Sequence, residues 1–223
     1  RQTFNGQNDL GGKVTATISR NGDLIHRMYV TCGFSKTGPI TRDPSINDIS
    51  MPGNLGTSLF KEIELEIGGQ KIDRLYGDWL ETWAELTEVN PHGLTNISTA
   101  ASDAFTDLKP PNHFSGNTLY QKMTGSGGTF GESNPSASYA TLSDLTIPLP
   151  FWFCRNVGLA LPLIALQYHE VKIMIQYNTA TAMGSTSDVE LSSNNLPSLW
   201  VDYIYLDTDE RRRFAQVSHE YLI

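Results

Sequence analysis

The chain has 223 residues, of which 39% are hydrophobic and 10% aromatic, and this is enough for one large domain with a sizeable core. Its formal net charge of −8 would repel a phosphate backbone, so we expect no direct contact with nucleic acid. No apolar run approaches the roughly 18 residues that span a bilayer, and we expect no transmembrane segment. Cys32 and Cys154 lie far apart without CxxC spacing, which favours two reduced thiols over a disulfide.

The first structured segment covers residues 13–30. Apolar and polar residues alternate over 14–19, which is the period of a half-buried strand. Asn21-Gly22 follows, and this pair tolerates the positive φ angles of a tight turn. Because β-branched and aromatic residues resume from Ile25, the segment predicts a β-hairpin.

The segment 60–75 contains the clearest strand pattern. Ile63, Leu65 and Ile67 alternate with three glutamates, and Gly68-Gly69 then turns the chain into a second strand. Such alternation predicts that the acids lie on a solvated sheet face rather than in a paired-carboxylate active site. The acids concerned are Glu62, Glu64 and Glu66.

One internal helix is predicted from "GDWLETWAELTEV", residues 77–89. Asp78 can cap it, and Glu81 stands three residues further on, as in a capping box. Trp79, Trp83 and Leu86 recur at helical spacing, so we expect them to form the core-facing stripe rather than a sugar or cofactor platform.

Composition changes over residues 91–144, where Ser, Thr, Asn, Gly and Pro dominate. Connections of this length are uncommon in compact domains, so we predict a long exposed loop that leaves a rigid scaffold. Asn96-Ile97-Ser98 within it is a possible N-glycosylation site at Asn96.

Strand-forming residues return after this loop. The firmest strand is expected over 167–177, and a last one is expected near 198–206. Short strands spread along the chain with a single good helix predict an all-β antiparallel sandwich or barrel, occupying residues 1–206. The histidines are scattered without metal-ligand spacing, and no nucleophile motif occurs. We therefore predict no catalytic, metal-binding or cofactor-binding residues, and no enzyme.

The chain closes with "DTDERRRFAQVSHEYLI", residues 207–223. An EF-hand would need glycine where Arg212 stands, so calcium is disfavoured. Acids followed by arginines instead suit a helix start with intrahelical ion pairs. The arginines are too closely balanced by acids for a nucleic-acid patch. We predict a helical connector that acts as a joint or interface, formed by Asp207, Asp209, Glu210, Arg211, Arg212 and Arg213.

Four stretches together resemble the major capsid proteins of the nucleocytoplasmic large DNA viruses. They are "SRNGDLIHRMYV", "IELEIGGQKIDRLYGDWLETW", "IPLPFWFCRNVGLALPLIALQYHEVKI" and "YLDTDERRRFAQVSHEYLI". The resemblance implies an eight-stranded antiparallel jelly-roll sandwich, the first half of a double jelly roll. It also implies homotrimeric, pseudo-hexameric capsomers that tile an icosahedral shell.

Further expectations follow from this resemblance. The partners would be other copies of the protein, neighbouring capsomers, a second jelly roll of the same polypeptide and minor capsid proteins. The location would be the virion, after assembly in the host cytoplasm. We expect the chain to be a fragment that lacks the second jelly roll, because an apolar end such as Tyr221-Leu222-Ile223 is unusual.

Two alternatives from other classes stay open at this stage. Trp79, Trp83 and Trp152, together with the polar loops, are compatible with a carbohydrate-binding jelly roll. An enzyme on a cupin-like barrel would need clustered metal ligands, which the spacings do not provide.

Overall fold

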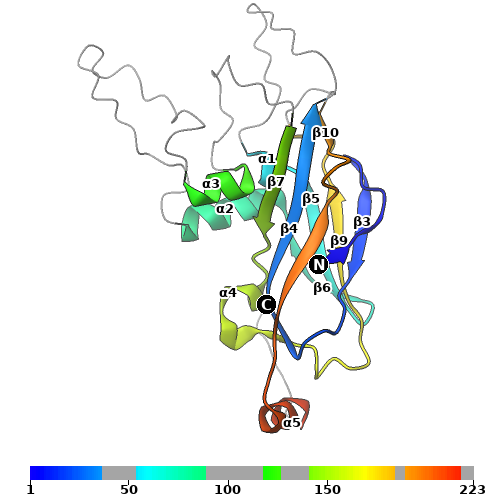
Figure 1. Cartoon of the computed structure of the whole chain (residues 1–223), viewed down its shortest axis with the longest axis vertical. Coiled ribbons are helices and arrows are strands. Elements are labelled where there is room, and N and C mark those ends of the chain that lie inside the picture. Colours follow the sequence, from blue (N-terminus) through cyan, green and yellow to red (C-terminus); the bar gives the residue numbers. More distant parts are fainter. Residues whose placement is uncertain (37–53, 89–117, 127–140, 184–188, 217–223) are drawn as a thin grey trace, which may run out of the picture.

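The computed structural model describes residues 1–36, 54–88, 118–126, 141–183 and 189–216. In these parts the chain forms two antiparallel sheets packed face to face, with helices beside one edge (Figure 1). Eleven strands are present in the described residues, and three of them, β1, β2 and β8, have two residues each. The remaining eight confirm the expected eight-stranded antiparallel sandwich.

The first sheet has five strands, and all its neighbouring strands are antiparallel. The strong alternation of β9, in which every second residue is buried, places its apolar side chains in the interior. The strands in spatial order are β2 (Asn5–Gly6), β3 (Lys13–Thr17), β9 (Val171–Tyr177), β5 (Phe60–Ile67) and β6 (Gln70–Leu75).

The second sheet is built around one long strand, β4. Val30 of β4 pairs with Leu199 on one side and with Ile147 on the other, so β4 lies at the centre of this sheet. The strands are β1 (Gln2–Thr3), β11 (Ser198–Ile204), β4 (Leu24–Lys36) and β10 (Val189–Leu191), with β7 (Thr141–Pro148) and β8 (Leu161–Pro162) also paired to β4.

The core fills the space between the two sheets. Its largest fully buried side chains come from both sheets and from the segments that connect them, and burial at this scale is the main stabilising contribution in a domain of this size. These side chains are Tyr177, Phe34, Phe60, Phe151, Phe153, Ile25, Met28, Leu55, Leu59, Ile63, Leu65 and Ile147.

Two hairpin predictions have opposite outcomes. The turn at Gly68 and Gly69, with φ angles of 59° and 85°, joins β5 to β6 as predicted. The hairpin predicted around Asn21-Gly22 is wrong, because β3 pairs with β9 while β4 pairs with β11 in the other sheet. This turn is therefore a crossover between sheets. A Cβ on Gly22 would lie 2.6 Å from the Cβ of Tyr203, so glycine allows the close approach.

The N-terminal residues cover one edge of the sandwich. β1 extends the second sheet beside β11, and β2 extends the first sheet beside β3. Between these two short strands the side chain of Phe4 is buried, with 6% exposure. A single short segment therefore adds a final strand to both sheets and closes the gap between them, which protects the edges from pairing with other chains.

Three helices lie beside the opposite edge (Figure 1): α1 (Leu55–Ser58), α2 (Gly77–Thr87) and α3 (Leu119–Thr124). The expectation of a single internal helix is therefore too low. α3 lies within the predicted loop 91–144, begins with a capping box between Thr118 and Gln121, and ends at Gly125 in the left-handed region. Asn96 lies outside the described residues.

The sequence interpretation of α2 is wrong in two respects. The N-cap is Tyr76, and Asp78 lies in the first turn without a capping hydrogen bond. The buried face consists of Gly77, Leu80 and Ala84, whereas Leu86 is 72% exposed. The helix is thus rotated relative to the predicted tryptophan stripe. The cause is close packing, because a Cβ on Gly77 would lie 2.6 Å from the carbonyl oxygen of Phe60.

Two short helical segments follow β7: α4 (Trp152–Arg155) and the 3-10 helix η1 (Val157–Leu159). The strand predicted from residue 167 begins only at Val171, because residues before it form turns. The last described element is α5 (Thr208–Gln216), which follows β11 and lies beyond the lower end of the sandwich in Figure 1.

Candidate interaction sites

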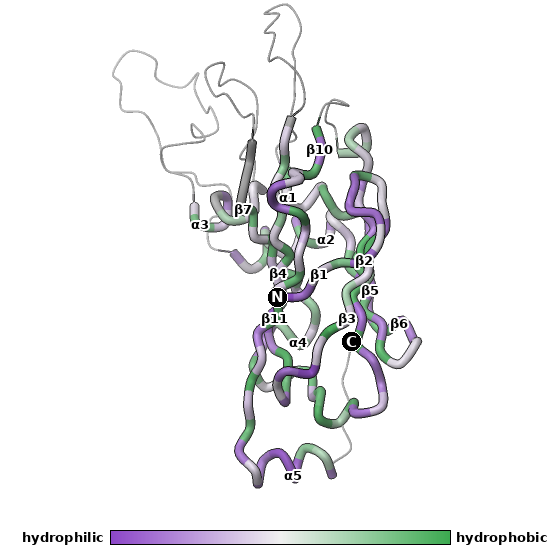
Figure 2. Tube along the Cα trace, turned by 45° about the vertical axis from the view of Figure 1, so that its right-hand side comes forward, coloured by the Kyte–Doolittle hydropathy of each residue, from purple (hydrophilic) through white to green (hydrophobic). Residues whose placement is uncertain are grey.

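The predicted joint forms a helix. The backbone N–H of Thr208 donates to Asp207 Oδ1 at 2.7 Å, and Asp209 and Glu210 lie in the first turn. Acids at this end suit the positive pole of the helix dipole. No residue of α5 is buried, and Figure 2 shows hydrophilic residues in its first turn. Residues 217–223 of the predicted connector lie outside the described residues.

Arg211 forms a different ion pair from those expected. Its Nη2 atom lies 3.0 Å from Oδ2 of Asp23, which precedes β4. Among the ion pairs of the described residues, none joins Asp209 or Glu210 to Arg212 or Arg213. The structure therefore brings one of the predicted joint residues to the sandwich and leaves the other arginines exposed.

Arg20 is a connecting residue that sequence reasoning missed. Its guanidinium donates to the backbone carbonyl oxygens of Leu166, at 2.6 Å, of His169, at 2.9 Å, and of Gln167. These contacts attach the crossover between β3 and β4 to the turns before β9. Three backbone acceptors around one guanidinium use the planar donor geometry of arginine, which lysine could not reproduce.

Glu64 on β5 is the centre of a second polar cluster. Its side chain is only 3% exposed, and its carboxylate pairs with Lys71 at 2.5 Å, with Arg74 at 2.8 Å and, more loosely, with Lys13 at 3.9 Å. Arg74 also pairs with Glu62 at 2.9 Å. The prediction of a solvated acid row is therefore wrong at Glu64. The reason is that β5 lies between β6 and β9, whose side chains cover it.

Burial of Glu64 by itself raises the pKa of its carboxyl group. Hydrogen bonds, first that from Lys71, then that with Glu62 and then that from Arg74, outweigh this effect and lower the pKa from 4.5 to about 2. Glu64 is thus ionised at neutral pH and acts as an anchor for the β5–β6 hairpin. Because its carboxylate is ionised and already paired with Lys71 and Arg74, we interpret the cluster as structural.

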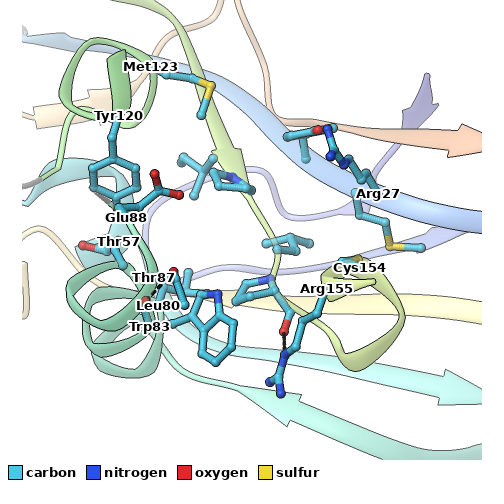
Figure 3. Close-up of a pocket in the computed structure, with 17 residues that line it drawn as sticks. Arg27, Thr57, Leu80, Trp83, Thr87, Glu88, Tyr120, Met123, Cys154 and Arg155 are labelled. Carbon is cyan, nitrogen blue, oxygen red and sulfur yellow. Dashed lines mark hydrogen bonds between the residues drawn. The ribbon is translucent and has the colours of Figure 1, made fainter. Parts of the chain in front are cut away.

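A pocket of about 500 Å³ lies between the helices and the second sheet (Figure 3). α2 and α3 form one wall, and β4, the end of β7 and α4 form the other. The guanidinium of Arg155 lies 4.4 Å from the ring centroid of Trp83, and its Nε donates to the carbonyl oxygen of Pro150 at 3.3 Å. The contact with Trp83 connects α4 to α2, and the bond to Pro150 holds the guanidinium beside the segment that precedes α4.

Two titratable groups of this pocket are held in their neutral forms at neutral pH. Burial is the main cause that raises the pKa of the Cys154 thiol to about 12, and it likewise raises the pKa of Tyr120 to about 12. Both groups are therefore protonated. Cys32 and Cys154 are free cysteines, as predicted.

The tryptophans proposed for carbohydrate stacking do not form one platform. Trp152 is only 6% exposed and packs edge-on against Phe153 at 5.0 Å, so a sugar cannot stack on it. Trp79, 36% exposed, lies 6.0 Å from Trp83 on α2, with their rings tilted by 40°. Trp152 therefore cannot form one sugar-binding surface together with Trp79 and Trp83.

The described residues contain neither a metal-ligand cluster nor a membrane-spanning helix. In the described ranges, no three His, Cys, Asp or Glu side chains lie close enough together to hold a metal ion. Across the same part of the chain, no helix has the length and apolar character required to cross a membrane.

An antiparallel sandwich of two sheets, with helices beside one edge and an exposed helix leaving one end, defines a jelly-roll module. Comparison with known proteins agrees with this class. The family model described as "Major capsid protein N-terminus" matches residues 1–207. The chain therefore belongs to the major capsid protein family of nucleocytoplasmic large DNA viruses, of which it represents the N-terminal jelly roll.

Individual relatives support this assignment. The chain is 45% identical over 222 residues to a major capsid protein of Pyramimonas orientalis virus, and 41% identical over 239 residues to one of Phaeocystis pouchetii virus. All of this chain aligns in both cases, but only 47% and 44% of the relatives. A chain of the PBCV-1 virus capsid model has a TM-score of 0.59 and 33% identity, covering 99% of this chain and 44% of that chain. The chain thus spans about half the length of these relatives.

Proposed function

We propose that the protein is a structural subunit of the icosahedral shell of a large double-stranded DNA virus. It assembles with copies of itself into trimeric, pseudo-hexameric capsomers. The observation that carries the proposal is the way the sandwich is bounded, with β1, β2 and Phe4 along one edge and α1–α3 packed beside β7 and β5 near the other. A sandwich bounded in this way stays rigid and resists edge-to-edge pairing, while its faces and ends remain free for defined contacts.

The second part of the proposal concerns the joint. α5 connects this sandwich to a second jelly roll of the same polypeptide, and this is supported by relatives of about twice the length. Arg211, Arg212 and Arg213 then act at the junction between the two barrels or between subunits. Arginine suits this role because its planar donors make directed hydrogen bonds at interfaces.

The remaining contacts follow from the same role. The shell subunit meets neighbouring capsomers and minor capsid proteins, has no enzymatic activity, and does not bind nucleic acid directly. Its net charge of −8 supports the last point. It resides in the virion after assembly in the host cytoplasm. Asn96 is a candidate site for a glycan in virions, and intact glycopeptide mass spectrometry of purified particles would test its occupation.

The test uses the full-length polypeptide that contains this chain. We expect sedimentation velocity to show trimers, and electron microscopy of these trimers to show a pseudo-hexagonal outline. Replacing Arg211, Arg212 and Arg213 by alanine should reduce the trimer yield while leaving the circular dichroism of the fold unchanged. Only monomers under all assembly conditions, together with virions that lack the protein, would refute the proposed function. An unchanged trimer yield in the triple variant would refute the joint alone.

A further inference from the structure

Asp23 lies in the crossover between β3 and β4, where this crossover contacts the segment that leads from β11 into α5. It lies directly before β4, whereas its partners come from the end of β11 and from α5, more than 180 residues later in the sequence. Its side chain is only 12% exposed. No sequence motif singles out this residue as functional.

Asp23 takes part in four hydrogen bonds, two through its carboxylate and two through its backbone. Oδ2 accepts from the backbone N–H of Leu206 at 2.8 Å and from Nη2 of Arg211 at 3.0 Å. The backbone N–H of Asp23 donates to Ile204 at 3.1 Å, and its carbonyl oxygen accepts from Ile164 at 3.2 Å. One residue therefore connects the crossover, the loop after β8, the end of β11 and the first turns of α5.

The contacts to α5 matter because no residue of this helix is fully buried, and Phe214 is the one described side chain in it that is half-buried. A single half-buried side chain fixes the direction of a helix less firmly than a buried apolar face does. The link between β11 and α5 is short, and rotation about its backbone bonds would swing the helix freely without further contacts. The two hydrogen bonds to Asp23 hold the link itself, at Leu206, and the first turn of the helix, at Arg211.

We propose that Asp23 is a positioning residue that fixes the direction in which α5 leaves the sandwich. The proposal rests on the proposed function in so far as that direction sets the angle between this jelly roll and the rest of the polypeptide. A carboxylate suits the task, because a single oxygen can accept from a backbone N–H and from a guanidinium at once. The pKa of Asp23 is lowered, first by the bond from Leu206 and, against the opposing effect of burial, also by that from Arg211.

The test measures the direction of α5 in the full-length polypeptide. Spin labels are attached through Thr17→Cys on β3 and Ala215→Cys on α5, both of which replace exposed residues, in a background without other accessible cysteines. Double electron–electron resonance then gives the distance distribution between the labels. We expect one narrow distribution for the protein with Asp23 intact, and its loss in Asp23→Ala. Arg211→Gln, which removes only the ion pair, should broaden the distribution less.

Asp202→Ala is the matched control, because it removes an exposed carboxylate from β11 that makes no ion pair in the described part of the chain. This control should keep the narrow distribution. Loss of the narrow distribution in Asp23→Ala supports the proposal, and an unchanged distribution in both Asp23→Ala and Arg211→Gln overturns it. If Asp23→Ala does not fold, Arg211→Gln, which alters a half-exposed side chain, decides alone. The measurement needs no assembly, so failure to form trimers would refute the proposed function without affecting this test.

Discussion

The helices α2 and α5 are attached to the same sandwich in different ways. Both carry acids in the first turn, Asp78 in α2 and Asp209 and Glu210 in α5. α2 buries Leu80 and Ala84 against its neighbours, whereas α5 has no fully buried residue and contacts the sandwich at Asp23. The similar acids at the start of each helix therefore say little about how it is held.

The difference separates stability from direction. Apolar burial contributes several kcal/mol per large side chain, while a partly exposed ion pair contributes about 0–1 kcal/mol. A helix held by packing cannot move without loss of fold stability. A helix held by hydrogen bonds to one residue can be redirected at small cost, which suits a joint. We therefore expect substitutions on the packed face of α2 to lower the free energy of unfolding more than substitutions in α5.

The largest effect is expected at Leu80. Its side chain is 5% exposed on the packed face of α2, whereas Leu86 on the same helix is 72% exposed. Leu80→Ala should lower the free energy of unfolding by about 3 kcal/mol, because it leaves a cavity in the contact with the sandwich. Denaturant unfolding followed by tryptophan fluorescence would measure this.

Leu86→Ala is the control, because it removes the same atoms from the solvent face of α2 and should change the free energy of unfolding by less than about 0.5 kcal/mol. Equal losses for Leu80→Ala and Leu86→Ala would mean that the packed face of α2 has been assigned wrongly, and that the tryptophan stripe predicted from the sequence faces the core after all.

The second effect concerns Glu64, a buried acid held by cations. Glu64→Gln should cost about 1–2 kcal/mol, less than a fully buried pair, because Lys71 and Arg74 are about half exposed and can regain water. The pKa of Glu64 is lowered from 4.5 to about 2. Its stabilising contribution is therefore complete above pH 4.5 and is lost as the pH falls from there towards 2.

The pH dependence gives the cleaner measurement. Between pH 4.5 and 2, the free energy of unfolding should fall more steeply in the unaltered protein than in Glu64→Gln. Glu66→Gln, on the same strand and without an ion pair in the described residues, should keep the steep fall. Parallel pH profiles for the unaltered protein and Glu64→Gln would show that Glu64 is not the acid concerned.

The sequence predicted the sandwich better than the placement of individual side chains. Period-two alternation identified β5 and the hairpin at Gly68-Gly69 because this signal is local. The same signal assigned Glu64 to solvent, since alternation gives only the face of a strand and not the neighbours that cover it. The turn at Asn21-Gly22 was recognised, but its strands belong to different sheets, which depends on pairing with distant β9 and β11.

The buried face of α2 and the contacts of Asp23 likewise depend on long-range packing that a local sequence pattern does not reveal. Two apolar stripes at helical spacing, one through Trp79 and Trp83 and one through Leu80 and Ala84, compete in the sequence. Only the close fit of Gly77 against the backbone near Phe60 selects the second. Asp23 and Arg211 are separated by 188 residues, so no local pattern could join them. The helix α5 itself was predictable from its acidic first turn.

A smaller effect is expected where an arginine connects two helices. Arg155→Gln removes the contact between its guanidinium and the ring of Trp83, and should cost about 0.5–1 kcal/mol because the pair is partly exposed. Arg27 on β4 lines the same pocket, so Arg27→Gln is the control and should change the free energy of unfolding less. Thermal unfolding of the two variants side by side would measure the difference. A larger loss in Arg27→Gln would contradict the assigned contact.

The smallest effect on folding is expected from the arginines of α5 that do not contact Asp23. Arg212→Ala and Arg213→Ala together remove two exposed side chains from a helix without buried residues, so the free energy of unfolding should change by less than about 0.5 kcal/mol. Alanine also has the higher helix propensity, so α5 should persist. Denaturant unfolding and the label distance between β3 and α5 should both stay unchanged. A loss comparable to that of Leu80→Ala would show that α5 is held by packing, as α2 is, and that the two helices do not differ in kind.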